Sequence, residues 1–123
     1  MDRGKIANVV TLYMAAWNEP DAATRNALLE QCWADGGVYV DPNAELMGRA
    51  ALSQHVAEVQ ASRPGARLEF MSGSDIHHNV LRFEWRLVRA DKTCGDTSVD
   101  FGEIGADGRL IKMTGFFGAA PKL

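Results

Sequence analysis

Residues 80–89, VLRFEWRLVR, alternate apolar and charged side chains, which is typical of a β-strand with one buried face. The apolar set is Leu81, Phe83, Trp85 and Leu87, and the charged set is Arg82, Glu84 and Arg86. One face of this strand should therefore lie against a core and the other should be polar. A charged sheet face of this kind often contacts a second subunit, so we expect a homodimer.

The same two-residue period extends over the C-terminal half of the chain. Residues 67–72, 97–104 and 110–117 also read as strands. Turn residues separate them at 73–75, 90–92 and 106–108, the last being Ala-Asp-Gly. We expect a curved antiparallel sheet with hairpin-like connections.

Upstream of residue 65 the period changes to that of helices. The first predicted helix runs from Arg3 to Trp17 and carries a stripe of apolar side chains on one face. A second helix begins after its cap at Asp21 and ends before residues 34–37. A third helix follows Gly48 until residues 63–65 break it. The first stripe consists of Ile6, Val9, Val10, Tyr13, Met14 and Trp17, and the third of Leu52, His55, Val56 and Val59.

A short strand, residues 38–41, separates the second and third helices and ends at Asp41 before Pro42. Three helices followed by strands predict an α+β fold for residues 1–123 as one domain. The helices would cover one face of a strongly curved sheet, leaving a cone-shaped molecule with an internal pocket.

Composition excludes several classes of function. The 13 basic and 16 acidic side chains are scattered, giving a net charge of -3 and no basic stripe for nucleic acid. No apolar run approaches the roughly 20 residues that span a bilayer, and the start shows no secretion signal. The two cysteines, Cys32 and Cys94, lack metal-ligand spacing. We expect a cytoplasmic protein that binds neither nucleic acid nor membrane, and we assign no metal to His77-His78.

The candidate polar residues each allow two interpretations. Tyr13 is either a core aromatic with a protein partner for its hydroxyl or a ligand contact. Asp41 is either a turn residue before proline or a pocket residue. Alternation in Val99-Asp100-Phe101 leaves Asp100 in water and turns its neighbours inward. His55 is either a neutral core histidine or an acid/base group.

The order and spacing of these elements resemble the nuclear transport factor 2-like superfamily over nearly the whole chain. The resemblance is carried by residues 13–18 (YMAAWN) with Asp21, 40–42 (VDP), 48–52 (GRAAL), 107–109 (DGR) and 115–118 (GFFG). The superfamily includes ketosteroid isomerases, SnoaL-type polyketide cyclases, scytalone dehydratase and many proteins of unknown activity. It implies a cystatin-like α+β roll, but a fold alone does not carry a reaction.

Against the ketosteroid isomerases, Tyr13 falls at the tyrosine that donates to the substrate oxygen and Asp41 at the base. Asp100 falls at their second donor, which in those enzymes is a carboxylic acid kept neutral by an apolar site. By this likeness Asp41 moves a proton next to a carbonyl, while Tyr13 and Asp100 hold the oxyanion. Val56 stands where the isomerases place a supporting tyrosine.

The resemblance therefore implies a small apolar ligand with a carbonyl or phenol, and no cofactor. We expect the remaining ligand-binding residues to be Trp17, Tyr39, His55, Phe83, Trp85, Met113 and Phe117. The alternatives are a binding domain without catalysis and a dehydratase-like enzyme that uses His55 with Asp41.

Overall fold

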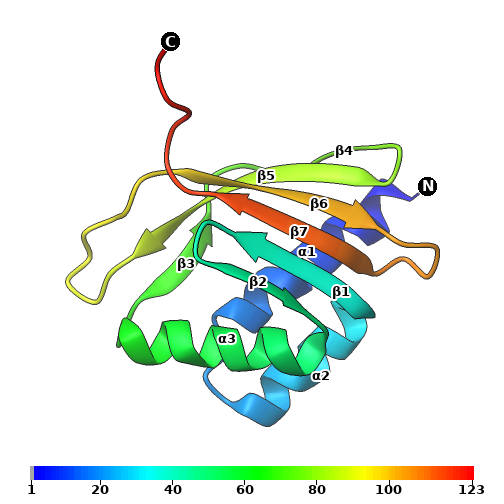
Figure 1. The fold of residues 1–123 in the computed structure, drawn as a ribbon, viewed down its shortest axis with the longest axis horizontal. Coiled ribbons are helices and arrows are strands. Elements are labelled where there is room, and N and C mark those ends of the chain that lie inside the picture. Colours follow the sequence, from blue (N-terminus) through cyan, green and yellow to red (C-terminus); the bar gives the residue numbers. More distant parts are fainter. Residues whose placement is uncertain (1) are drawn as a thin grey trace.

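The computed structural model describes residues 2–123 as three helices packed on a curved, unclosed mixed sheet (Figure 1). Along the chain, the elements are α1 (Arg3–Trp17), α2 (Ala22–Cys32), β1 (Trp33–Asp41), β2 (Ala44–Met47), α3 (Arg49–Ser62), β3 (Arg67–Phe70), β4 (Asp75–His77), β5 (Val80–Val88), β6 (Ser98–Ile104) and β7 (Leu110–Phe116). The α+β class and the three helices predicted from the sequence are confirmed. Among residues 2–123, no helix is both long enough and apolar enough to cross a membrane.

Capping residues fix where the first two helices begin. The Asp2 carboxylate accepts a hydrogen bond from the backbone N–H of Lys5, and Asp21 accepts one from Thr24. Gly48 precedes α3 with a φ of 92°, in the region that favours glycine. The cap predicted at Asp21 is confirmed, as is the start of α3.

The sheet has the strand order β2-β1-β7-β6-β5-β3, with β4 paired to β5 beside this path. The expectation of an antiparallel sheet is wrong at one pairing, because β1 runs parallel to β7. The helix α3 and the strands from β3 to β6 lie between β1 and β7 in the chain, so no hairpin constrains their direction. Two short strands, β2 and β4, were not predicted.

Strand β1 is longer at its start than the predicted residues 38–41. Residues 34–37 continue the strand instead of ending a helix, because the buried Trp33 already lies in extended backbone after α2. A Cβ on Gly37 would lie 2.5 Å from the Trp33 indole nitrogen, so only glycine fits beside this ring.

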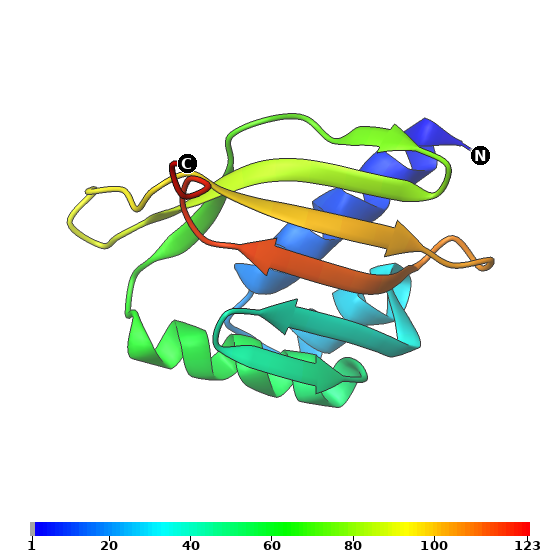
Figure 2. The same cartoon turned by 45° about the horizontal axis from the view of Figure 1, so that its top comes forward.

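All three helices lie against the same face of the sheet (Figure 2). The core fills the space between them with large apolar side chains that are almost fully buried. This core includes Leu29, Trp33, Leu52, Val56, Phe83, Leu110 and Met113. The apolar face predicted for residues 80–89 is confirmed, with Leu81 and Phe83 in the core and Trp85 and Leu87 nearer the open end.

Strand β6 reverses the orientation that its alternation favours. Asp100 is 6% exposed, whereas Phe101 points outward and is 44% exposed. Large side chains from the neighbouring strands occupy the core beneath β6: a Cβ on Gly102 would lie 3.0 Å from Leu81 and 3.2 Å from Leu110. The inward face of β6 therefore carries small or polar residues, and the pattern-based placement of Asp100 in water is wrong.

Candidate active site

A cavity of about 390 Å³ opens between the sheet and the helices. Eight of the ten residues expected at the site line it: Tyr13, Trp17, Tyr39, Asp41, His55, Trp85, Asp100 and Phe117. Phe83 and Met113 do not, because they lie deeper in the core, where Phe83 packs edge-on against Phe70. A volume of this size is in the range of sites for small organic molecules.

Asp41 occupies the end of β1, with its side chain only 5% exposed. The Tyr39 hydroxyl donates to Asp41 Oδ2 at 2.7 Å, and the backbone N–H of Asn43 donates to Oδ1 at 2.7 Å. Tyr39 reaches this carboxyl because residues two apart on a strand share a face, and the Asn43 contact is an Asx turn. Both interpretations of Asp41 are therefore correct: it is a turn residue and it lines the cavity.

His55 approaches the same carboxyl from α3. Its Nε2 lies 3.9 Å from Asp41 Oδ2, which is too long for a hydrogen bond. The imidazole packs against the Trp17 and Tyr39 rings, with centroid distances of 5.9 and 5.6 Å, and these two rings also contact each other at 5.5 Å. His55 thus forms part of the aromatic wall and lies just beyond hydrogen-bond distance of Asp41.

Asp100 enters the cavity from the middle of the sheet. The Trp85 indole N–H donates to Asp100 Oδ1 at 2.9 Å. Burial raises the pKa of Asp100 to about 7, the Trp85 hydrogen bond opposes this shift, and the negative Asp41 adds to it. Near neutral pH, a large fraction of Asp100 therefore carries a proton and can donate a hydrogen bond.

Tyr13 presents a hydroxyl that is buried and makes no hydrogen bond with any group in residues 2–123. Its ring stacks on Trp33 with centroids 5.7 Å apart, and the Trp17 indole approaches it edge-on without the geometry of a hydrogen bond to the hydroxyl. Burial, reinforced by Asp100, raises the pKa of Tyr13 well above its usual value. The residue is a neutral phenol with a donor available to a ligand.

Gly115, which the sequence pattern did not indicate as a site residue, separates the two carboxyls. It pairs with Asp100 across β6 and β7, and β1 is the neighbour of β7 on its other side. A Cβ at this position would lie 2.9 Å from Asp100 Oδ1 and 3.7 Å from Asp41 Cβ. The absent side chain lets both carboxyls reach one space, and no periodicity in the sequence could reveal this.

We expect Gly115→Ala to displace the Asp100 carboxyl from its contact with Trp85. Overpacking a filled site of this kind costs about 1–3 kcal/mol of stability. Phenol binding should also weaken, because one donor moves away. Urea unfolding and calorimetric titration with 2-naphthol measure the two effects. Gly36→Ala is the matched control, since its Cβ meets nothing within 4 Å, and equal behaviour of the two variants would contradict the role given to Gly115.

The histidine pair of the sequence lies elsewhere. His77 and His78 are exposed at the end of β4, with their Nδ1 atoms 3.1 Å apart. In residues 2–123, no group of three or more histidine, cysteine or carboxylate side chains is arranged to hold a metal ion.

Comparison with known proteins bears on the fold and more weakly on the activity. No protein-family model and no curated protein sequence matches the chain. A SnoaL-like family protein from Agrobacterium tumefaciens, for which isomerase activity is proposed, has a TM-score of 0.88 at 29% identity, over 94% of this chain and 99% of that one. An NTF2-like protein of unknown function from Exiguobacterium has a TM-score of 0.73 at 16% identity, over 91% and 99% of the two chains.

A proposed polyketide cyclase from Sinorhizobium meliloti has a TM-score of 0.71 at 16% identity, over 88% of this chain and 93% of that one. The two similarities at 16% identity show the fold alone. The chain therefore shares the α+β fold of SnoaL-like and NTF2-like proteins, in agreement with the resemblance found in its sequence. Its more specific likeness, at 29% identity, is to a SnoaL-like protein.

Proposed function

We propose that this protein is a cofactor-independent isomerase or cyclase that moves a proton on a carbon next to a carbonyl group. One observation carries the proposal: an acceptor carboxyl, a carboxyl with a pKa raised to about 7 and a phenol without a hydrogen-bond partner in residues 2–123 all line one apolar cavity. Enolisation needs a base near the carbon and donors near the oxygen, in a site with little water.

In this mechanism Asp41 removes the proton, and its carboxyl is held in place by Tyr39 and Asn43. The negative charge moves to the substrate oxygen, where Tyr13 and Asp100 donate hydrogen bonds. The donor proton of Asp100 resides on Oδ2, since Oδ1 accepts the hydrogen bond from Trp85. Asp41 then returns the proton to a different carbon in an isomerisation. In a cyclisation, the enolate carbon attacks a second carbonyl of the same molecule, and the alkoxide that forms takes the proton from Asp41.

The test is deuterium uptake at the carbon next to the carbonyl. Wild-type protein in D₂O is incubated with enolisable ketones and with β-dicarbonyl compounds that resemble polyketides, and exchange is followed by NMR. The protein should accelerate exchange for at least one of these classes. Phenol binding without any exchange would support a non-catalytic binding domain instead.

A second reaction class is favoured by the approach of His55 to Asp41 at 3.9 Å. A dehydratase needs an acid for the leaving hydroxyl, and His55 is the group placed to supply it while Asp41 removes the proton. His55→Gln separates the two reactions, because it should stop dehydration of a β-hydroxyketone and leave proton exchange largely intact.

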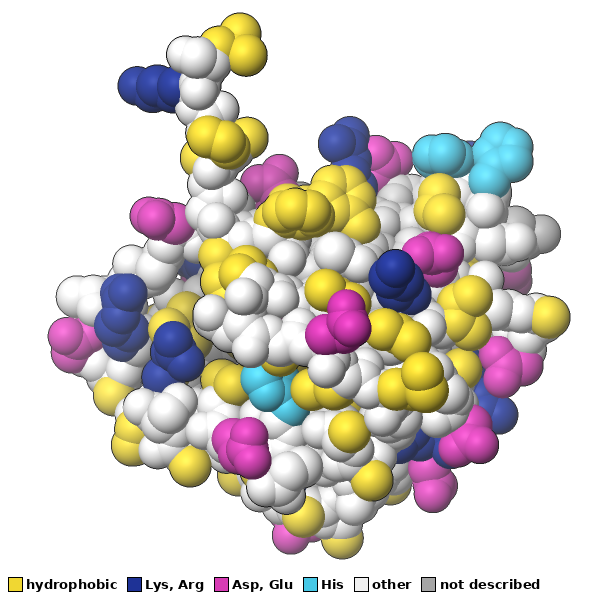
Figure 3. Space-filling view, viewed as in Figure 1, with side chains coloured by type: hydrophobic (Ala, Val, Ile, Leu, Met, Phe, Trp, Pro, Cys, Tyr) yellow, Lys and Arg dark blue, Asp and Glu magenta, His cyan; other side chains and the backbone are white. Residues whose placement is uncertain are grey.

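We also propose that the protein forms a homodimer through the outer face of its sheet. Hydrophobic side chains are spread over β6 and β7 on the face seen in Figure 3. Phe101 and Phe116 pack edge-on there with centroids 6.0 Å apart, although they are 44% and 55% exposed. Apolar area of this kind on adjacent strands is typical of a contact surface.

Replacing both rings with charges, Phe101→Glu and Phe116→Lys, should convert the dimer to a monomer. The desolvation of charges in an apolar contact opposes association. Light scattering with size-exclusion chromatography measures the mass, and circular dichroism checks that the fold is kept. A wild-type protein that is monomeric at all accessible concentrations would contradict the dimer.

A further inference from the structure

Two arginines at the open end of the cavity lack the carboxylate partner that most other arginines have. Arg63 follows α3 and lines the cavity, and Arg89 follows β5. Within residues 2–123, no carboxylate oxygen lies within 4.0 Å of either guanidinium. By contrast, ion pairs join Arg49 to Asp35, Arg67 and Arg86 to Glu69, Arg82 to Asp75, and Arg109 to Asp107.

Arg89 does not line the cavity itself, but it directly follows β5, in line with the inward-facing residues of that strand. Leu87, two residues earlier, lines the cavity, and so does Gly95 in the loop that returns beside it. A Cβ on Gly95 would lie 3.8 Å from Arg89 Nη2 and 3.6 Å from Leu87 Cβ, so the guanidinium lies over the rim. The Arg89 guanidinium donates a long hydrogen bond of 3.5 Å to Thr93 Oγ1, which itself donates to Asp91 Oδ1.

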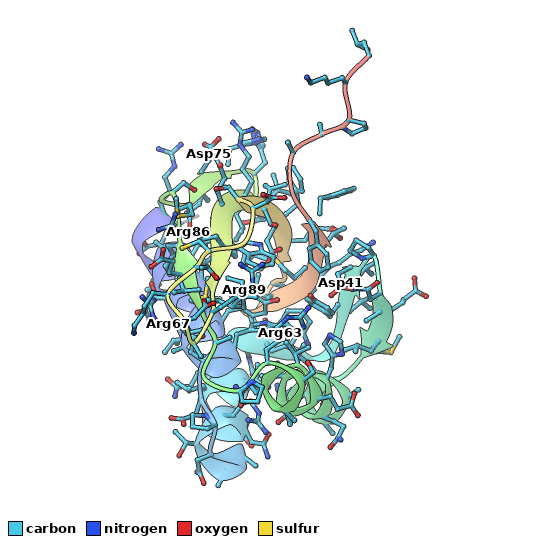
Figure 4. All side chains as sticks on the ribbon, turned by 90° about the vertical axis from the view of Figure 1, so that its left-hand side faces the viewer. Asp41, Arg63, Arg67, Asp75, Arg86 and Arg89 are labelled. Carbon is cyan, nitrogen blue, oxygen red and sulfur yellow. The ribbon has the colours of Figure 1, made fainter. Side chains whose placement is uncertain are left out.

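Figure 4 looks at this end of the molecule and shows Arg63 and Arg89 toward the middle, on the side of Asp41. Arg67 and Arg86 lie to the left of these two residues. Their separation follows from the register, in which Glu69 pairs with Arg86 on the outer face while Leu68 and Leu87 point inward. Two unpaired positive charges therefore border the opening in a chain whose net charge is -3.

The inner end of the cavity has the opposite character. Tyr13 and Asp100 lie there, 2% and 6% exposed, and the apolar Leu68 and Leu87 also line the cavity. One acidic side chain, Asp96, also lines the cavity, and no arginine lies within 4.0 Å of its carboxyl. A ligand that fills this space meets a hydrogen-bonding inner end, an apolar middle and a positive rim.

The geometry points to a ligand with two polar ends: a carbonyl or phenol that enters the cavity and a carboxylate that stays at the rim on Arg63 and Arg89. Arginine is suited to this role because its planar guanidinium binds a carboxylate through two parallel hydrogen bonds. The inner half of this ligand rests on the proposed function, whereas the carboxylate subsite rests on the two arginines alone.

Matched phenols test the subsite in the full-length protein. We compare 2-naphthol with 6-hydroxy-2-naphthoate, and the longer 4-phenylphenol with 4′-hydroxybiphenyl-4-carboxylate, by calorimetric titration at low salt. The carboxylate should tighten binding about five- to tenfold for the pair whose length fits, as expected of two partly exposed ion pairs. This gain should shrink as salt is added.

Variants test whether the two arginines cause the tighter binding of the carboxylate. Arg63→Gln with Arg89→Gln should abolish the preference for the carboxylate while leaving the affinity for the neutral phenol unchanged. Arg82→Gln is the matched control, because it removes the same charge from the outer face of the same strand. Asp96→Asn should act in the opposite direction and increase the preference, since it removes a negative charge from the cavity wall.

The other outcomes distinguish a failure of this subsite from a failure of the proposed function, and only the last contradicts both. The subsite alone is overturned if the neutral phenols bind and the carboxylate does not tighten binding. It is also overturned if the tighter binding persists in the double arginine variant. If the carboxylate tightens binding through the arginines but the protein catalyses no proton exchange, the subsite is supported and the proposed enzymatic function is contradicted. Failure of all four compounds to bind contradicts both.

Discussion

Asp41→Asn should lower the rate of proton exchange by about a thousandfold, within the 10²–10⁴ range of a general base. The amide keeps the shape of the carboxyl and one oxygen for the hydrogen bond from Tyr39 or Asn43, but it cannot accept the substrate proton. Binding of 2-naphthol should persist, because the donors Tyr13 and Asp100 remain. NMR exchange rates and calorimetric titration provide the two measurements.

Asp96→Asn serves as the matched control for this variant. It makes the same chemical change at another carboxyl of the same cavity, and it should leave the exchange rate of a neutral ketone close to that of the wild type. Equal losses in the two variants would indicate a general electrostatic effect. An unchanged rate in Asp41→Asn would remove Asp41 from the mechanism and leave His55 as the nearest candidate base.

The sequence was sufficient to predict elements with a strong period. The stripe on α1 places Tyr13 inside, and the alternation of β5 places Trp85 and Leu87 on the cavity side. These predictions hold because hydrophobic burial acts along each element by itself. The same periodicity correctly predicted that Leu52 and Val56, on α3, are buried in the core of the protein.

The rest depended on contacts between distant segments. Asp100 turns inward because β6 packs over large side chains from β5 and β7, and only the family resemblance anticipated it. Phe83 and Met113 were expected at the site on apolar character, which does not distinguish a cavity wall from a filled core. The parallel pairing of β1 with β7 and the space left by Gly115 likewise arise from the tertiary fold.

The two buried carboxyls of the cavity suit the different roles proposed for them, because their hydrogen-bond partners differ. Asp41 accepts hydrogen bonds from two donors at the end of β1, whereas Asp100 accepts one in the middle of the sheet. The contrast suits a site in which one carboxyl accepts a proton and the other donates a hydrogen bond. It also implies that the burial of Asp100 lowers the stability of the fold.

This loss of stability from the buried Asp100 depends on pH. The pKa of Asp100 is about 7 in the folded protein against an ordinary value of 3.8. Between these values the folded state holds a proton that the unfolded state has released, so the free energy of unfolding falls as pH rises from about 4 to about 7. The total loss is about 4 kcal/mol, and above this window it no longer grows.

Asp100→Asn should remove this loss, because the amide stays neutral and its oxygen can still accept the Trp85 hydrogen bond. Near pH 8 the variant should therefore be more stable than the wild type by a few kcal/mol, and near pH 4 the two should be similar. Urea unfolding across this range measures the difference. Trp85→Phe should act oppositely on the wild-type carboxyl, since losing the indole donor raises the pKa of Asp100 further and extends the fall in stability to higher pH. Parallel stability profiles for wild type and Asp100→Asn would contradict a protonated Asp100, and with it the second donor of the oxyanion site.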